Sequence, residues 1–219
     1  MAAPRRSAKQ RAVLIAQRLA VEYPEAVCEL DHRNPFELLA ATILSAQTTD
    51  ARVNLVTPEL FARYPDAAAL ALADPGAVEE IVRSAGFYQT KARNLIAMAR
   101  ALVERFDAQV PTALEDLVSL AGVGRKTANV VRSVAFKLPG LPVDTHVGRL
   151  SRKLGLTTQE DPVKVEAELG RYLQPALWGD FSLRLILHGR RVCAAKKPLC
   201  GECALQDVCP SSILPRVRK

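Results

Sequence analysis

The segment from Leu120 to Ala128 combines two glycines with an arginine and a lysine, and this combination can bind a phosphate group. The segment reads Leu-Ala-Gly-Val-Gly-Arg-Lys-Thr-Ala, which predicts a helix on each side of a tight turn. Glycine lets the backbone approach another backbone closely, and N–H groups at a helix start attract anions. A Gly-x-Gly sequence also occurs in ordinary turns between helices, so the turn alone leaves both interpretations open. The candidate nucleic-acid contacts are Gly122, Val123, Gly124 and Arg125.

Lys126 lies in the first turn of the second predicted helix and is a candidate nucleophile. A lysine amine attacks only in its neutral form, and the positive end of the helix dipole disfavours the charged form. A partly dry pocket would act in the same direction. A neutral amine at this position could attack an electrophilic carbon and form a Schiff base. The alternative is that Lys126 only pairs with a phosphate.

Four of the five cysteines fall within one short stretch near the C-terminus. In a reducing compartment such clusters are more often metal sites than disulfides. The spacing has one Cys-x-x-Cys pair, whereas zinc ribbons usually have two, and a 4Fe–4S cluster tolerates a looser loop. Spacing alone leaves zinc and iron–sulfur open, and the remaining Cys28 is interpreted as an ordinary buried thiol. The candidate ligands are Cys193, Cys200, Cys203 and Cys209.

The elements that must position these residues are predicted to be helices, about ten in number. A capping side chain followed by proline predicts a helix start in three places. No segment shows sustained strand alternation with a hairpin signal, so the fold class is all-α. Thr112 with Glu115 predicts a capped short helix ending near Leu120, and Thr90 predicts the cap of a long helix through Phe106. The three capped prolines are Pro35, Pro75 and Pro162; the first and last helices are predicted at 11–22 and about 180–191.

Composition limits the function. The chain has 219 residues, of which 49% are hydrophobic, so it can bury a sizeable core. Its net charge of +7 favours a polyanionic partner, either nucleic acid or an anionic membrane surface. Charges interrupt every apolar run well short of the roughly 18 residues that a membrane span needs. The basic segment Met1 to Lys9 leads into an amphipathic stretch rather than an export signal, which predicts a cytosolic protein with reduced thiols.

Four stretches together resemble the helix-hairpin-helix base-excision DNA glycosylases, and specifically the endonuclease III group. They occur in the family's order and extend over about residues 20–210. In this resemblance Lys126 matches the nucleophile and Asp144 the essential aspartate. The stretches are residues 44–50 (Leu-Ser-Ala-Gln-Thr-Thr-Asp), the hairpin at 120–128, residues 143–147 (Val-Asp-Thr-His-Val) and the four-cysteine tail.

The resemblance implies a bifunctional DNA glycosylase and abasic-site lyase that removes oxidised pyrimidines from duplex DNA and cuts the strand by β-elimination. Asp144 is expected to cap a helix and to stabilise the positive charge that forms as the base leaves. The implied fold has two helical domains with the active site in the cleft between them. They are a six-helix domain at 28–138, which contains the hairpin, and a cluster domain formed by 1–27 and 139–219. The protein is expected to be a monomer in the cytoplasm, associated with the nucleoid.

The resemblance also assigns the four cysteines to a 4Fe–4S cluster. The loop between the first two cysteines carries Lys196 and Lys197. The cluster is therefore expected to stiffen a basic loop that contacts phosphates.

A base inside a stacked duplex must be flipped out before it can react. Gln47 matches the family residue that enters the vacated space, and Phe87 matches an apolar wedge that is often leucine. The alternatives are that Gln47 caps the end of a helix and that Phe87 is a core aromatic. The aromatic wedge departs from the family pattern and puts the lesion preference in doubt.

His146, a further candidate DNA contact, bears on the branch of the family. The adenine-mismatch branch usually has Gly-Asn after the aspartate and lacks the lysine, whereas this chain has Asp-Thr-His and Lys126. The sequence therefore fits the strand-cutting branch. The alternative functions are a mismatch glycosylase of the same superfamily and a non-catalytic DNA-binding protein that uses the hairpin as a clamp.

Overall fold

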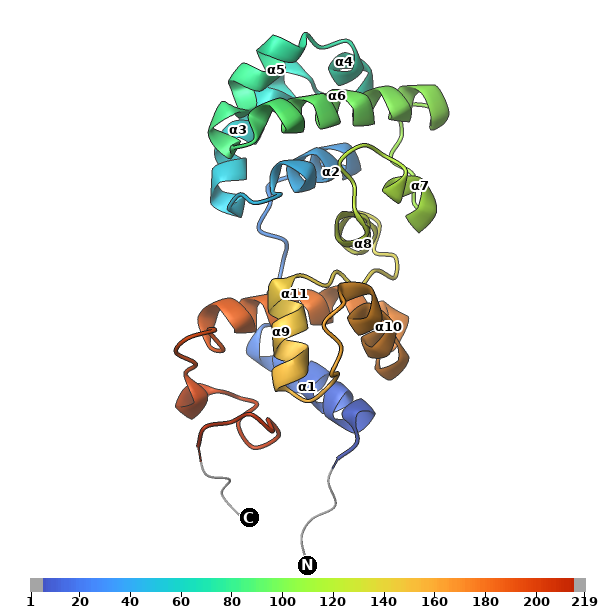
Figure 1. The fold of residues 1–219 in the computed structure, drawn as a ribbon. Helices are drawn as coiled ribbons and strands as arrows, with labels where there is room; N and C mark the ends of the chain where they lie inside the picture. The colour runs from blue at the N-terminus through green and yellow to red at the C-terminus, as the bar shows by residue number, and fades with distance from the viewer. Residues whose placement is uncertain (1–5, 215–219) are drawn as a thin grey trace, which may run out of the picture. The chain divides into compact units, whose positions relative to one another are not determined.

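The fold was obtained as a computed structural model, and the structure describes residues 6–214. The described residues form α-helices and short 3-10 helices without a strand, which confirms the predicted all-α class. Met1 to Arg5, part of the segment interpreted above as lacking an export signal, lie outside the described residues. The chain divides into two compact units (Figure 1). We call Cys28–Leu138 the hairpin unit and Met1–Val27 with Pro139–Lys219 the terminal unit.

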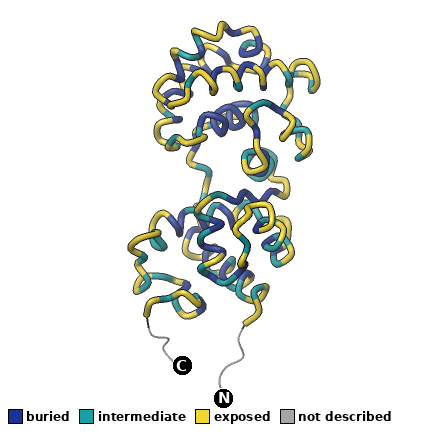
Figure 2. Tube along the Cα trace, viewed as in Figure 1, coloured by how far each residue is buried: buried dark blue, intermediate teal, exposed yellow. Residues whose placement is uncertain are grey.

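The hairpin unit, all of whose residues are described, contains seven α-helices where six were predicted. All residues of α2 after Pro35 are buried, so this helix forms the centre of the unit (Figure 2). The longest helix, α6, packs against α4 and α5 on one side and against α2 on the other (Figure 1). The elements are α2 (Pro35–Leu44), α3 (Asp50–Arg63), α4 (Ala67–Ala71), α5 (Pro75–Val82), η1 (Arg83–Ala85), α6 (Tyr88–Arg105), α7 (Leu114–Val118) and α8 (Arg125–Val134).

The terminal unit is built from both ends of the chain. Helix α1 packs against α10 and α11, and α11 also packs against α9. Ile15 and Leu19 of α1 are fully buried in the same core as Leu185 of α11. The first helix therefore completes a core that the last third of the chain supplies. The elements are α1 (Ala8–Glu22), α9 (Thr145–Lys153), α10 (Pro162–Tyr172), η2 (Pro175–Leu177), α11 (Trp178–Arg191) and η3 (Cys200–Glu202).

The three predicted capped prolines are confirmed as helix starts. Asn34, Asp74 and Asp161 each accept the N–H of the residue three positions later, in every case at 2.9 Å. Each cap satisfies one of the N–H groups that a helix start leaves without a partner, which is worth about 1 kcal/mol. These starts depend on neighbouring residues only, so local sequence predicts them.

Two other predicted caps are wrong. Helix α6 begins at Tyr88, and its N-cap position is Phe87 in a left-handed conformation, so Thr90 lies inside the first turn. Helix α7 begins at Leu114 with Ala113 at the N-cap position, and among the described residues no side chain caps it. Thr112 thus lies one residue too early to act as the cap. Of the helices in residues 6–214, none is both long and apolar enough to cross a membrane.

Candidate functional site

The Gly-Val-Gly turn joins α7 to α8 in the hairpin unit as predicted. Gly122 has a φ of +76°, and a Cβ atom there would lie 3.0 Å from the Cβ of Asn94 on α6. Both the backbone conformation and the close approach of α6 therefore require glycine at this position. The Val123 side chain is buried, and its N–H donates to the Leu120 carbonyl at 3.1 Å. The buried side chain and this hydrogen bond both stabilise the turn.

Gly124 differs from Gly122 because the chain's own packing does not require it. Its φ of −89° and ψ of 172° suit any residue, and a Cβ atom there would meet nothing within 4 Å. The residue is exposed and occupies the N-cap position of α8. The missing side chain leaves room for an external group to approach the start of the helix.

The start of α8 has the features of an anion-binding site. No side chain in residues 6–214 caps this helix, and Arg125 and Lys126 are both exposed in its first turn. N–H groups at a helix start and the adjoining dipole attract a phosphate. The structure thus places the candidate nucleophile beside the candidate phosphate contacts Gly124 and Arg125.

Asp144 is the N-cap of α9 in the terminal unit. Its Oδ1 accepts the Val147 N–H at 2.8 Å, and its Oδ2 lies 3.3 Å from Nδ1 of His146. One oxygen therefore fixes the side chain in place, while the other faces the imidazole ring of His146. The carboxylate is half-buried, so it is oriented and still open to an external group.

His146 lies on α9 against α11 in the terminal unit. A Cβ atom on Gly189 of α11 would lie 2.9 Å from the His146 Cδ2 atom, closer than packed atoms come. The absence of a side chain at Gly189 therefore makes room for the imidazole. This packing determines how His146 stands beside Asp144.

Gln47 and Phe87 share an unusual backbone conformation. Their φ values are +55° and +47°, in the left-handed region that non-glycine residues rarely adopt. Each such residue costs on the order of 1–3 kcal/mol and persists only when its surroundings hold it. Both side chains are exposed, and Phe87 retains 68% of its accessible surface. Phe87 is therefore not a core aromatic, and Gln47 lies beyond Ser45, the C-cap of α2.

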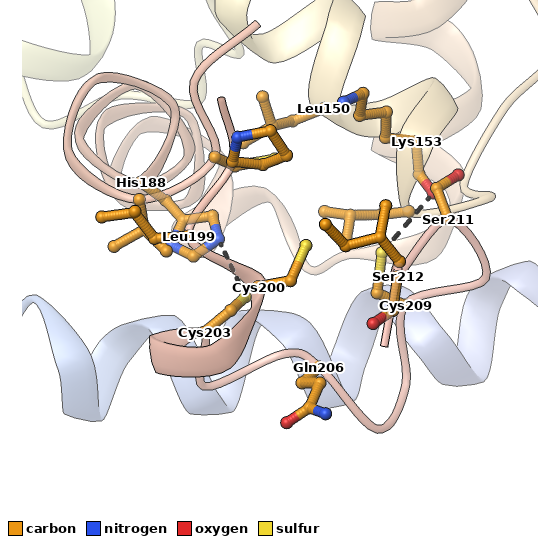
Figure 3. Close-up of a pocket in the computed structure, with 15 residues that line it drawn as sticks. Leu150, Lys153, His188, Leu199, Cys200, Cys203, Gln206, Cys209, Ser211 and Ser212 are labelled. Carbon is orange, nitrogen blue, oxygen red and sulfur yellow. Dashed lines mark hydrogen bonds between the residues drawn. The ribbon is translucent and has the colours of Figure 1, made fainter. Parts of the chain in front are cut away.

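The four candidate metal ligands line one cavity in the terminal unit. Figure 3 shows Cys200, Cys203 and Cys209 around this space, and Cys193 also lines it. Burial raises the pKa of the Cys203 and Cys209 thiols, and the other cysteines nearby raise it further. Four such thiols together are the soft donors that iron–sulfur clusters and zinc use.

The cavity is large enough to hold a metal group. Its volume is about 50 Å³, several times the roughly 10–15 Å³ that one water molecule occupies. The four cysteines that line it supply the thiolates that either a 4Fe–4S cluster or a zinc ion takes as ligands.

His188 is a buried neighbour of this cavity that the sequence analysis missed. Its Nδ1 lies 3.0 Å from the Tyr23 hydroxyl and its Nε2 lies 3.5 Å from the Cys203 Sγ. Burial, together with the positive charge of Arg149, lowers the pKa of His188 to about 4. The ring is therefore neutral at neutral pH, with Tyr23 and Cys203 at its two nitrogens.

The remaining candidates are two lysines near the cysteine cavity and Cys28 in the hairpin unit. Lys196 and Lys197 are exposed in the segment between α11 and η3, which also carries Cys193. Cys28 is half-buried against the core of the hairpin unit, and burial raises the pKa of its thiol. Lys91, which the sequence analysis did not single out, is buried on α6 with its amine close to the loops of Gln47 and Phe87.

Comparison with known proteins identifies the family. Residues 40–175 match the model of the HhH-GPD superfamily base excision DNA repair proteins. The chain is 54% identical over 207 residues to the endonuclease III of Synechocystis, with 94% of each chain covered. It is 44% identical over 191 residues to the endonuclease III of Bacillus subtilis, covering 85% of this chain and 86% of that protein.

A solved structure of a non-covalent endonuclease III–DNA complex is similar in fold as well as in sequence. It has a TM-score of 0.88 and 41% sequence identity, and the match covers 93% of this chain and 96% of that one. The predicted resemblance is thereby confirmed. An uncapped hairpin helix with an exposed lysine, an aspartate N-cap and four cysteines around one cavity thus occur in a chain that belongs to the endonuclease III family of the HhH-GPD base excision DNA repair superfamily.

Proposed function

We propose that this protein is a bifunctional DNA glycosylase and abasic-site lyase that removes oxidised pyrimidines from duplex DNA. The observation that carries the proposal is the start of α8, where Lys126 stands exposed two residues after Gly124, whose missing side chain leaves the helix start open to an external group. A solved endonuclease III is described as a trapped covalent intermediate with DNA, and it is 41% identical to this chain. A covalent step requires a nucleophile, and Lys126 is the residue whose position suits it.

In the proposed reaction the Lys126 amine forms a bond to C1′ of the damaged nucleotide, and the glycosidic bond breaks. The base leaves with one of the two amine protons, and the C1′–O4′ bond of the sugar then opens as O4′ takes up a proton, which gives an iminium Schiff base that keeps the second amine proton. Removal of a C2′ proton then expels the 3′ phosphate oxygen and cuts the strand. The backbone at Gly122 and Gly124 and the Arg125 side chain hold a neighbouring phosphate during these steps.

We assign Asp144 to charge stabilisation. Because its Oδ1 is used by the Val147 N–H, its Oδ2 is the oxygen that can face the positive charge developing on the sugar. His146 lies beside this oxygen and holds its orientation. Helix capping and charge stabilisation are then two uses of one carboxylate.

We further propose that Cys193, Cys200, Cys203 and Cys209 hold a 4Fe–4S cluster. When bound, the cluster would tie the last segment of the terminal unit into one structure. Lys196 and Lys197 lie within this segment and would then present their charges to phosphates from a stiffened loop. Gln47 and Phe87 are proposed to fill the space that the extruded base leaves. Such a substrate implies that the protein acts at the chromosomal DNA.

A borohydride-trapping experiment tests the proposed nucleophile. Wild-type protein with a duplex bearing thymine glycol should give a covalent adduct after reduction, and Lys126→Gln should give none. The variant should still bind abasic DNA, because one cation contributes little of the total phosphate attraction. Lys137→Gln, which changes another exposed lysine of the hairpin unit, is the matched control and should trap normally. Trapping by Lys126→Gln at the wild-type rate would exclude this lysine as the nucleophile.

The two alternative functions give different results in the same assay. A mismatch glycosylase without lyase chemistry would excise a mismatched base and leave the strand intact. A non-catalytic hairpin protein would bind every duplex and release no base. Lys126 and the family match both favour the lyase.

A further inference from the structure

Lys91 is a buried lysine to which the proposed reaction gives no role. It lies in the first turn of α6 with 4% of its surface exposed. Burial lowers the pKa of its amine, and in the described part of the chain no carboxylate forms an ion pair with it. A lysine is rarely buried in this way without a specific task, because removing its charge from water is costly.

The amine of Lys91 connects two loops that are far apart in the sequence. It donates to the Thr48 hydroxyl at 2.7 Å and to the Ala85 carbonyl at 2.7 Å. The Thr48 hydroxyl in turn donates to the same Ala85 carbonyl at 2.5 Å. The three groups form a closed triangle of hydrogen bonds, which we call the Lys91 clamp.

Each loop in the clamp carries a non-glycine residue with a left-handed backbone, Gln47 in one loop and Phe87 in the other. Gln47 immediately precedes Thr48, and Phe87 follows Ala85 by two positions, after Gly86 with a φ of +69°. Such conformations persist only where the surroundings hold them. The clamp lies between the two positions and joins them through one buried atom, the Lys91 Nζ.

We propose that Lys91 is a positioning residue that fixes the Gln47 loop and the Phe87 loop in one arrangement, so that both side chains enter the duplex together. This inference rests on the proposed function, because it assigns the clamp to the flipping of a damaged base. Lys91 itself touches neither the reacting atoms nor the DNA. It acts through Thr48 and Ala85.

If Lys91 only stabilised the end of η1, it would need only the hydrogen bond to the Ala85 carbonyl. Ala85 ends the 3-10 helix η1, and a cation at the end of a helix satisfies its last carbonyl group. That role does not require the contact to Thr48, which lies 43 residues away in sequence. The second contact makes Lys91 a link between loops rather than a cap on one.

The test uses Lys91→Met, which keeps the length of the side chain and removes the donors, and Thr48→Val, which removes the shared hydroxyl. Arg100→Met is the matched control. Arg100 lies on the same helix and donates to the Ala71 carbonyl at 3.0 Å, so it makes a similar contact away from both loops. Hydrogen exchange of the free protein is measured first. Lys91→Met should speed exchange in both loops, 46–48 and 85–88, and Arg100→Met should speed it in neither.

Single-turnover kinetics then separate flipping from chemistry. Lys91→Met should slow base excision from a paired lesion by about tenfold and slow cutting at a preformed abasic site by less than about threefold. In a Phe87→Ala background the same substitution should have a smaller effect on excision, because one of the two side chains that Lys91 positions is gone. Additive losses in this double-mutant cycle would overturn the proposal.

The hydrogen-exchange result stands independently of the proposed reaction. If the wild-type protein excises no base, the proposed function fails. Faster exchange of both loops in Lys91→Met would still establish that Lys91 links them. If excision proceeds but Lys91→Met speeds exchange in one loop only, the function stands and the proposed link is wrong. Equal losses of rate on the paired and abasic substrates in Lys91→Met would likewise show that Lys91 has only a structural role.

Discussion

Replacing Phe87 with alanine should separate base flipping from bond cleavage. The side chain retains 68% of its accessible surface, so its removal costs the fold little of the 3–5 kcal/mol expected for a buried phenylalanine, as a rough scale. The strained backbone at φ +47° is the same in both proteins, since alanine relieves it no better than phenylalanine. The effect should therefore appear on DNA rather than on the thermal unfolding temperature.

The magnitude follows from stacking. An aromatic ring stacked on a base is worth about 1–3 kcal/mol, which corresponds to a loss of about five- to 150-fold in the rate of excision. That loss should apply to a thymine glycol paired in duplex DNA. Cutting at a preformed abasic site should change much less, because no base remains to be extruded.

The assay is single-turnover release of the base and cutting of the strand, measured on the two substrates in parallel. Leu55→Ala is the matched control, because Leu55 is an equally exposed apolar side chain of the hairpin unit at 69%. It should alter neither rate. Equal losses on both substrates for Phe87→Ala, or a drop in its unfolding temperature well beyond that of Leu55→Ala, would refute the assignment of Phe87 as a wedge.

Three further predictions concern the cluster, the hairpin and the clamp. Purified protein should contain about four irons per chain, and Cys203→Ser should lose iron while Cys28→Ser keeps it; one zinc per chain would exclude the cluster. Gly122→Ala should lower the unfolding temperature because of its φ of +76° and the close Asn94 side chain, whereas Gly124→Ala should keep it and weaken DNA binding. The reverse pattern in a binding titration would contradict the phosphate role. Burial lowers the pKa of Lys91 from its ordinary 10.5, so at pH values between the lowered pKa and 10.5 the unfolded chain binds a proton that the folded chain has released. The difference in the free energy of unfolding between wild type and Lys91→Met should therefore rise with pH towards 10.5. Identical pH profiles for the two proteins would show that the pKa of Lys91 is not lowered.

Local chemistry accounts for the parts of the fold that the sequence predicted. The caps at Asn34, Asp74 and Asp161 succeed because side chain, proline and helix start lie within four residues. The cap predicted at Thr90 fails because Gly86 and Phe87 turn the chain through two positive φ values and start α6 earlier. That turn is held by Lys91 and Thr48, which no window of neighbouring residues contains together.

The same limit applies to the candidate site. Lys126 and the four cysteines stand out because their type and spacing are visible along the chain. His188 could not be found in this way, since its partner Tyr23 lies 165 residues away. Lys91 resembles any helical lysine until its burial is known. Residues that act through tertiary contacts therefore escape sequence analysis, whereas residues that act through local motifs do not.

Because the terminal unit is formed from both ends of the chain, the two units must fold in a fixed order during synthesis. The hairpin unit is one continuous segment, so it can fold as soon as Leu138 has left the ribosome. Helix α1 emerges first but must wait for α10 and α11 before Ile15 and Leu19 find their partners. At about 5–20 residues per second this wait lasts roughly 10–30 s, during which an apolar helix face stays exposed. A nascent chain stalled before α11 should therefore expose α1 to chaperones and proteases while its hairpin unit is already protected.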